Sequence, residues 1–253
     1  MTPEYIVPHS FRQFGELIAL QSTRTGGVSK GPYAALNLGI NTRDSAEMVH
    51  ENTLRLCAAA GINPERLVSS EQVHGTEILT AEKPGRYQGY DAFITGKTDL
   101  HLCIFTADCY PVLIFDPRHH ATGAVHAGWK GSAGRIVMKT VAAMQKNFNS
   151  IPAECFAYIG TGISSAAYEV GLDVAREFPS DSCLPSPFST DEGRYMLDLG
   201  MVNCRQLIDS GIPAQNIERS QFCSFGDSSM FFSYRRDNGI TGRMVSIIGV
   251  RPQ

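Results

Sequence analysis

Two apolar runs on either side of a short polar break constrain this chain more than any other feature. The runs are Leu102–Phe105 and Val112–Phe115, and the break between them is Thr106–Pro111. Each run has the length and composition of a buried β-strand. Because the interior of a buried central strand excludes an acidic residue and a proline, the break separates two strands. The apolar segment Ala121–Ala127 predicts a further strand, so we expect a fold organised around a buried sheet.

Three segments have the periodicity of amphipathic helices. The first is Ala46–Ala60, and Gly61 directly after it is a plausible C-cap. The second runs from about Arg135 to Phe148, with Ser132 as a candidate N-cap, and the third is about Leu197–Asp209. We therefore expect three helices between and after the predicted strands.

The order of these elements favours one fold class. The C-terminal segment Met230–Val250 predicts a β-hairpin that turns at Asp237–Gly239, and Ser180–Glu192, rich in Pro, Ser and Asp, predicts an exposed loop. Strands and helices do not alternate with the regular rhythm of a doubly wound fold. We therefore predict a mixed-sheet fold, α/β or α+β.

Composition sets the class of protein. With 253 residues, 43% of them hydrophobic and 19% charged, the chain suits one globular domain spanning residues 1–253. A net charge of −3 argues against nucleic-acid binding, because phosphate backbones select basic surfaces. We find no stretch of about 18 apolar residues and no secretory signal pattern in residues 1–20, so we expect no membrane span. Seven cysteines without a Cys-x-x-Cys pair favour reduced thiols and a cytoplasmic location, whereas the oligomeric state stays open.

Three residues in separate patches are candidate metal ligands. Cys109 lies in the break between the two central strands, beside Asp108, a position that raises it above the other cysteines. His126 ends the predicted strand Ala121–Ala127 and leads into a glycine-rich turn. His74 precedes a glycine. An isolated cysteine is most often a small buried hydrophobe and an isolated histidine a surface residue, so the local settings carry this hypothesis.

These three side chains fit two kinds of chemistry. One cysteine and two histidines can make a three-ligand site with an open fourth position, as in catalytic zinc enzymes. Their long spacings are not those of a zinc finger and suit a catalytic site assembled from separate loops. Without metal, Cys109 and His126 could instead form a thiolate–imidazolium pair, which would make the protein an amide or ester hydrolase.

Four basic residues are candidates for binding an anion. Lys130 lies in a glycine-rich turn, Gly128–Gly134, that leads into a predicted helix, and Arg24 precedes a double glycine. Both turns have the alternative of being ordinary turns. Arg235 and Arg236 lie at the end of the predicted hairpin, where strand alternation would point them to opposite faces. At most one of these two arginines would then face a pocket, and the other would pair with Asp237 or with solvent.

Several of these patches together resemble a known family. They are Thr23–Ser29, Leu36–Gly39, Glu71–Gly75, Thr106–Pro111, Val125–Gly131, Tyr168–Gly171, Phe232–Asp237 and Thr241–Met244. They resemble the laccase-domain (YfiH-type) family, whose members are also called purine nucleoside phosphorylases or polyphenol oxidases. The resemblance extends from about Thr23 to Val250. One local departure is Gly160–Ile163, where a proline is common after the first glycine.

The resemblance implies a fold, a cofactor and a reaction. The fold would be a mixed α/β sandwich with helices on its flanks. The cofactor would be zinc, with His74, Cys109 and His126 as the matching ligands. The implied reactions are phosphorolysis of adenosine, guanosine, inosine and methylthioadenosine, and deamination of adenosine. Older descriptions of the family imply copper-dependent oxidation of phenols, and some bacterial members are linked to correcting peptidoglycan precursors that carry serine in place of alanine.

The implied reactions assign roles to the candidate residues. Deamination needs an acid that protonates the departing ammonia, and we expect Asp108 or Glu71 to supply it. Phosphorolysis needs phosphate beneath the ribose C1′, and our candidates to hold it are Arg24, Lys130, Arg235 and Arg236.

Three alternatives remain open at this point. One is a Cys109–His126 amide hydrolase that edits peptidoglycan precursors. A second is a copper-dependent polyphenol oxidase, although the chain has no paired His-x-His motif for a multicopper cluster. The third is a nucleoside-binding protein without turnover. Trp129, the only tryptophan, could stack on a base, but packing beneath the glycine-rich turn is our expectation.

Overall fold

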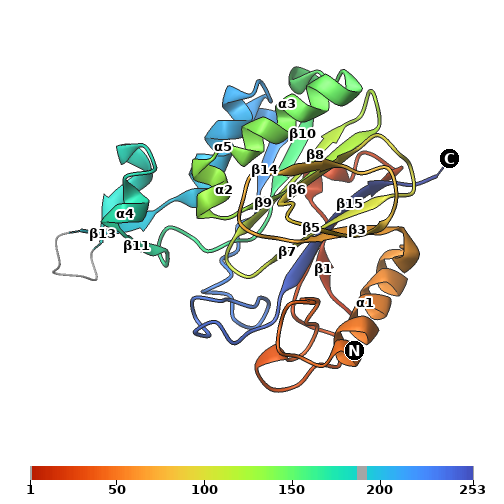
Figure 1. The fold of residues 1–253 in the computed structure, drawn as a ribbon, viewed down its shortest axis with the longest axis horizontal. Helices are drawn as coiled ribbons and strands as arrows, with labels where there is room; N and C mark the ends of the chain where they lie inside the picture. Colours follow the sequence, from red (N-terminus) through yellow and green to blue (C-terminus); the bar gives the residue numbers. More distant parts are fainter. Residues whose placement is uncertain (1, 187–192, 253) are drawn as a thin grey trace.

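The computed structural model describes residues 2–186 and 193–252. Two six-stranded mixed sheets pack face to face, and helices cover the outer face of each (Figure 1). The first sheet has the order β1 (Tyr5–Ile6), β2 (Leu17–Ser22), β15 (Met244–Val250), β7 (His101–Thr106), β3 (Leu67–Glu71) and β5 (Gly85–Gln88). The second has the order β14 (Ile217–Arg219), β10 (Phe156–Ile159), β8 (Tyr110–Asp116), β9 (Ala121–Ala127), β6 (Ala92–Thr95) and β4 (Ile78–Thr80). The predicted mixed sandwich is confirmed.

The core between the two sheets explains the apolar runs of the sequence. Phe93, Leu102, Leu113, Phe115 and Tyr158 come from both sheets and are at most 1% exposed. Every residue of β8 and β9 is buried, because the first sheet covers one face of these strands and helices cover the other. A strand buried on both faces has no polar face, and its sequence is therefore a continuous apolar run.

Helices complete the outer layers. They are α1 (Ala46–Ala60), α2 (Trp129–Ala133), α3 (Ile136–Phe148), α4 (Leu172–Ala175) and α5 (Leu199–Asp209). α1 packs on the first sheet, whereas α3 and α5 pack on the second. In the part of the chain that the structure describes, no helix has the length and apolar character needed to span a bilayer.

The predicted helices are confirmed, with one wrong cap. α1 begins after Ser45, whose hydroxyl accepts the Met48 N–H, and ends at Gly61 in the left-handed conformation (φ 66°). Ser132 does not cap α3, because it lies inside the separate short helix α2 and its hydroxyl donates to Asn203. The N-cap of α3 is Arg135.

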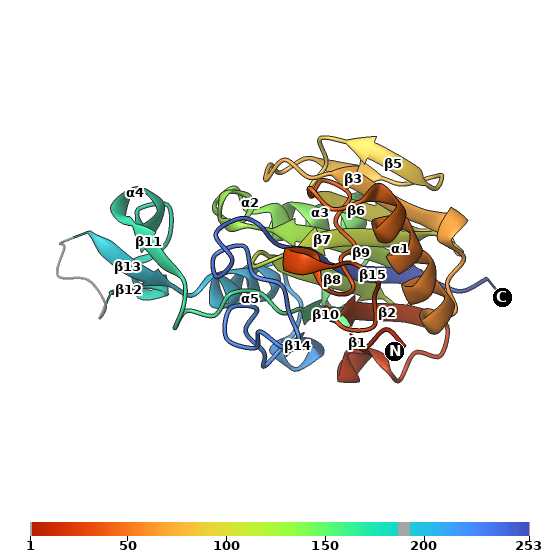
Figure 2. The same cartoon turned by 90° about the horizontal axis from the view of Figure 1, so that it is seen from below.

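A small third sheet extends from one end of the sandwich. It consists of β11 (Glu169–Gly171), β13 (Arg194–Leu197) and β12 (Cys183–Pro185), all antiparallel, and both views place it with α4 outside the main body (Figures 1 and 2). The loop predicted for Ser180–Glu192 is therefore wrong over β12, and residues 187–192 lie outside the described part of the chain. Tyr168 precedes β11, at the base of this extension.

The predicted C-terminal hairpin is wrong. Asn238 and Gly239 do turn the chain, with φ of 49° and 86°, but residues 230–243 form loops and turns, and only β15 is a strand. Both edges of β15 already pair with β2 and β7, so no edge is left for a hairpin partner. The argument from strand alternation for the two arginines before this turn therefore loses its basis.

Candidate metal centre

Two loops and one strand end bring the predicted ligands together. His74 follows β3, Cys109 lies in the bend between β7 and β8, and His126 is near the end of β9. Their ligand atoms all lie within 4.8 Å of one another. The imidazole rings of His74 and His126 meet edge to face, with centroids 4.7 Å apart. Residues far apart in the sequence thus form one cluster.

The backbone at two of these positions has an unusual conformation. His74 has φ of 59°, and Asp108, directly before Cys109, has φ of 93°. A side chain other than glycine is uncommon in the left-handed region, and such conformations concentrate at functional sites. The acidic break predicted from the sequence is therefore a sharp bend that turns the Cys109 side chain toward the histidines.

Asp91 holds both histidines in place. It is fully buried directly before β6, and its Oδ1 lies 2.7 Å from His126 Nδ1. The same carboxylate accepts the N–H groups of Val73 (3.1 Å), His74 (3.0 Å) and Gly75 (2.7 Å). An ionised carboxylate only accepts hydrogen bonds, so the proton of His126 lies on Nδ1 and Nε2 is left as the ligand atom.

The cluster is electrostatically coupled. Burial raises the pKa of Cys109, but the His126 and His74 imidazoles outweigh this effect and lower the pKa to about 6. Burial lowers the pKa of His126, yet the Cys109 thiolate and Asp91 raise it to about 9. With this pKa, Cys109 is largely a thiolate at neutral pH. The thiolate is the form of cysteine that binds a metal or attacks an electrophile.

The glycine-rich turn after β9 serves close packing against this cluster. A Cβ at Gly128 would lie 2.9 Å from Cys109 Sγ and 3.2 Å from His74 Cδ2. At Gly131 it would lie 3.2 Å from the carbonyl oxygen of Gly75, and at Gly134 2.6 Å from Thr76 Cγ2. The glycines therefore let the turn approach the loop that carries His74.

The donor set fits zinc. Thiolate and neutral imidazole are the ligands that zinc prefers, and three protein ligands are typical of a catalytic zinc site. Copper also binds such nitrogen and sulfur ligands, so the donor set alone does not select between the two metals.

A cavity of about 460 Å³ opens above the three ligands. Aromatic side chains contribute to its wall, namely Phe105, Tyr168 and Tyr234. Two arginines also line it, and each lies over one of these rings. Arg235 is 5.2 Å from the ring centroid of Tyr168 and Arg243 is 5.5 Å from that of Tyr234. The cavity thus combines a candidate metal site, aromatic surface and positive charge.

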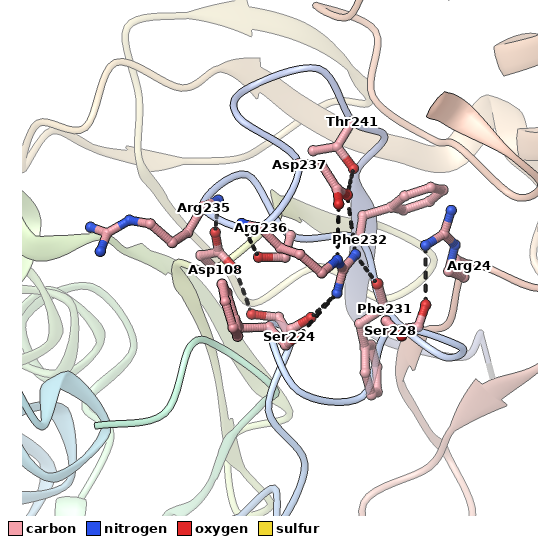
Figure 3. A network of polar contacts seen from close by, with 12 residues as sticks. Arg24, Asp108, Ser224, Ser228, Phe231, Phe232, Arg235, Arg236, Asp237 and Thr241 are labelled. Carbon is pink, nitrogen blue, oxygen red and sulfur yellow. Dashed lines mark hydrogen bonds and ion pairs between the residues drawn. The ribbon is translucent and has the colours of Figure 1, made fainter. Parts of the chain in front are cut away.

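Asp108 and Arg235 are the predicted site residues, besides the ligands, that the structure brings into this cavity. Asp108 is 9% exposed. Its Oδ1 accepts a hydrogen bond from the Ser224 hydroxyl (2.7 Å) and its Oδ2 from the Arg235 N–H (2.6 Å; Figure 3). Asp108 therefore fixes the loop that carries Arg235.

Arg236 and Arg24 are engaged elsewhere and are not among the residues that line the cavity. Arg236 forms an ion pair with Asp237 (2.9 Å) and donates to the carbonyls of residues 224, 225 and 231. Arg24 donates to the carbonyls of Ala34 and Ser228 with all three nitrogens. Figure 3 shows Arg236 inside this network and the Arg235 side chain directed away from it.

Lys130 and Glu71 are also absent from the cavity wall. Lys130 is exposed, with its Nζ 5.5 Å from the ring centroid of Trp129. Glu71 is exposed at the end of β3. Trp129 packs against the core formed by the second sheet and its helices, as expected.

Comparison with known proteins identifies the family. Residues 18–251 match the family model described as multi-copper polyphenol oxidoreductase laccase. The purine nucleoside phosphorylase of Deinococcus radiodurans is 42% identical over 248 residues, which make up 98% of this chain and 91% of that protein. This chain belongs to the laccase-domain family.

Two solved structures are similar to this laccase-domain protein throughout. YlmD from Geobacillus stearothermophilus has a TM-score of 0.88 at 34% identity, with 95% of this chain and 94% of that chain covered. The hypothetical protein YfiH from Bacillus licheniformis has a TM-score of 0.90 at 31% identity, with 98% and 97% covered. Their similarity supports the sandwich architecture described above.

The family description refers to several copper ions. The number of converging ligand side chains indicates how many ions this chain could hold. In the part of this laccase-domain protein that the structure describes, His74, Cys109 and His126 are the one group of three converging His, Cys, Asp or Glu side chains. The described residues therefore provide ligands for a mononuclear centre rather than for a multicopper cluster.

Sequence reasoning missed three residues of this site. Asp91 precedes the apolar strand β6, and an acid directly before a buried strand was the available signal. Arg243 and Tyr168 lie in two motifs of the family resemblance, Thr241–Met244 and Tyr168–Gly171, to which no role was assigned. Nothing local in the sequence indicates that these motifs meet at one cavity.

Proposed function

We propose that this laccase-domain protein is a zinc-dependent purine nucleoside phosphorylase that also deaminates adenosine. Its substrates would be adenosine, inosine, guanosine and methylthioadenosine, together with phosphate. The observation that carries the proposal is the convergence of His74, Cys109 and His126 at a cavity with aromatic walls. The names of relatives from Deinococcus radiodurans and Geobacillus stearothermophilus support the phosphorylase activity.

The metal ligands and the buried Asp91 would have separate roles. A zinc ion held by His74, Cys109 and His126 would supply Lewis-acid chemistry at an open fourth position. Asp91 keeps the proton of His126 on Nδ1 and anchors the backbone of the His74 loop. The site can therefore keep its geometry while substrates enter and leave.

The cavity wall would bind the nucleoside. Phe105, Tyr168 and Tyr234 offer aromatic surface on which a purine can stack. Burial raises the pKa of the Tyr168 phenol, so this side chain stays neutral and acts as a hydrogen-bonding group. Asp108 lines the same cavity beside Cys109, and we propose it as the acid for the departing ammonia. Glu71 is exposed outside the cavity wall and is the weaker candidate.

The proposal includes a reducing, cytoplasmic setting. All seven cysteines are free thiols, including Cys109, and a reducing compartment keeps thiols in this state. A copper ion in the same site would account for oxidation of phenols, but the one ligand cluster among the described residues would hold a single ion rather than a multicopper centre.

Product analysis tests the proposed function. Protein of measured zinc content is incubated with adenosine, with and without phosphate, and the products are separated by chromatography. We expect inosine without phosphate, adenine and ribose 1-phosphate only with it, and neither from Cys109→Ala. Cys204→Ala, a matched change of a half-buried cysteine on α5 that does not line the cavity, should keep both activities. No turnover by zinc-loaded wild type would refute the proposal for this substrate.

One observation favours a second candidate function. Cys109, His126 and Asp91 form a chain of thiol, imidazole and carboxylate, with the pKa of Cys109 near 6. This arrangement suits an amide hydrolase acting on peptidoglycan precursors. Such an enzyme would keep its activity in a metal chelator and lose it on alkylation of Cys109. The zinc enzyme would lose its activity in the chelator and regain it when zinc is restored.

A further inference from the structure

Two of the family motifs surround Arg243 and fix its position. Its backbone N–H donates to Asn37 Oδ1 (2.9 Å), and its carbonyl accepts the Leu38 N–H (3.1 Å). Its side chain passes directly over Gly39, where a Cβ would lie 2.6 Å from Arg243 Cγ. The segment 36–39 and the segment 241–244 thus interlock, and the missing side chain of Gly39 leaves room for the arginine.

The guanidinium of Arg243 has unused donors. Nη1 donates to the carbonyls of Thr241 and Gly242, both at 2.9 Å. In the described part of the chain, Nε and Nη2 have no protein partner, and no carboxylate forms an ion pair with this arginine. The side chain is half-buried and lines the cavity. A partly buried cation with free parallel donors is the arrangement that binds an oxyanion in bidentate fashion.

The other basic residues of the site offer less. The nitrogens of Arg24 and of Arg236 donate to carbonyl groups and, for Arg236, to Asp237. Arg235 lines the cavity but is exposed, donates to the carbonyl of Glu169 and lies over the Tyr168 ring. Arg243 alone combines a place in the cavity, partial burial and free donors.

We propose that Arg243 binds the phosphate of the phosphorolysis reaction. The inference rests on the proposed function. In this step a phosphate oxygen forms a bond to C1′ of the ribose while the bond from C1′ to purine N9 breaks. The electron pair of the broken bond goes to N9, and the purine takes up the proton that the phosphate releases. Arg243 orients the phosphate and stabilises its negative charge through hydrogen bonds, without exchanging a proton with it.

Calorimetric titration with inorganic phosphate tests the assignment without turnover. The zinc-loaded wild type is compared with Arg243→Gln, with Arg243→Lys and with Arg118→Gln, a matched change at an exposed arginine that does not line the cavity. We expect Arg243→Gln to weaken phosphate binding about 10- to 100-fold, as for the loss of a charge-assisted pair. Arg243→Lys, which keeps the charge but loses the parallel donors, should weaken it about 3- to 10-fold. Arg118→Gln should bind like the wild type.

Each outcome decides for or against the assignment. Unchanged phosphate affinity in Arg243→Gln, or no phosphate binding by the wild type, overturns it. If Arg243→Gln does not fold, unchanged affinity in Arg243→Lys overturns it and reduced affinity supports it. Steady-state kinetics separate the inference from the proposed function, because Arg243→Gln should raise the KM for phosphate by a larger factor than the KM for the nucleoside. Arg243-dependent phosphate binding without any ribose 1-phosphate would retain the anion site and reject the phosphorylase.

Discussion

Replacement of Asp91 by asparagine should damage both the metal centre and the stability of the fold. The Asp91 carboxylate is fully buried and accepts four hydrogen bonds. Oδ1 accepts from His126 Nδ1 and the His74 N–H, and Oδ2 accepts from the N–H groups of Gly75 and Val73. In asparagine, an NH₂ group replaces one of the two carboxylate oxygens. An NH₂ group donates hydrogen bonds and cannot accept them, so it would face two N–H donors without bonding to either. Two of the four hydrogen bonds are therefore lost in either orientation of the amide.

The structure sets the magnitude of this effect. A hydrogen bond to a charged group contributes about 1.5–3 kcal/mol, so two lost bonds give an upper bound of about 3–6 kcal/mol. The bonds share one acceptor group and are not additive, so we expect the free energy of unfolding of Asp91→Asn to fall by about 2–4 kcal/mol. Loss of such a partner of a ligating histidine typically weakens metal binding about 10- to 100-fold.

The pH dependence of this difference follows from the pKa of Asp91. Burial raises this pKa, but the hydrogen bonds from His126, Gly75 and Val73 outweigh it, so the pKa is lowered in the folded protein. A lowered pKa means that the stabilisation is complete above the unfolded value of about 4. The stability difference between wild type and Asp91→Asn should therefore shrink as the pH falls through the folded pKa.

Asp116→Asn is the matched control for this prediction. Asp116 is also fully buried, and it accepts hydrogen bonds from His119 Nδ1 (2.8 Å), the His119 N–H and the Arg118 N–H, at the end of β8 away from the cavity. Urea unfolding of the zinc-free proteins gives the stabilities, and competition with a chromophoric chelator gives the zinc affinities. Both variants should lose stability, but only Asp91→Asn should lose zinc affinity. Equal zinc affinity in Asp91→Asn and wild type would refute the reasoning.

Three further predictions concern the same molecule. Gly128→Ala should weaken zinc binding, because its Cβ would lie 2.9 Å from Cys109 Sγ, whereas Gly15→Ala, with nothing within 4 Å, should bind zinc normally in the same competition assay. In zinc-free protein, the alkylation rate of Cys109 should rise through a midpoint near pH 6, and His126→Gln should move that midpoint upward, as mass spectrometry of the alkylated protein will record. Leu113→Ala in the sandwich core should lower the free energy of unfolding by about 2–5 kcal/mol and leave zinc affinity unchanged, and a normal urea midpoint would contradict this.

The extent of successful prediction depended on the range of the interactions involved. The breaks and strand ends that carry Cys109 and His126 were visible because a buried strand excludes polar residues, a rule that acts over a few positions. The C-terminal hairpin was predicted by the same kind of local signal and was wrong. The turn at Asn238 and Gly239 exists, but β15 takes its pairing from β2 and β7, strands that are distant in the sequence.

The sequence by itself predicted the three longest helices, the central strands and three candidate ligands that converge, because apolar periodicity and strand breaks are local properties. The tertiary structure alone decided which charged groups serve the site. The guanidinium nitrogens of Arg24 and Arg236 donate hydrogen bonds to carbonyls and, for Arg236, to Asp237. Arg243, in contrast, has two guanidinium nitrogens at the cavity without a hydrogen-bond partner among the described residues. A guanidinium is free or engaged according to the carbonyl groups that distant segments place around it, and only the packed chain fixes those positions.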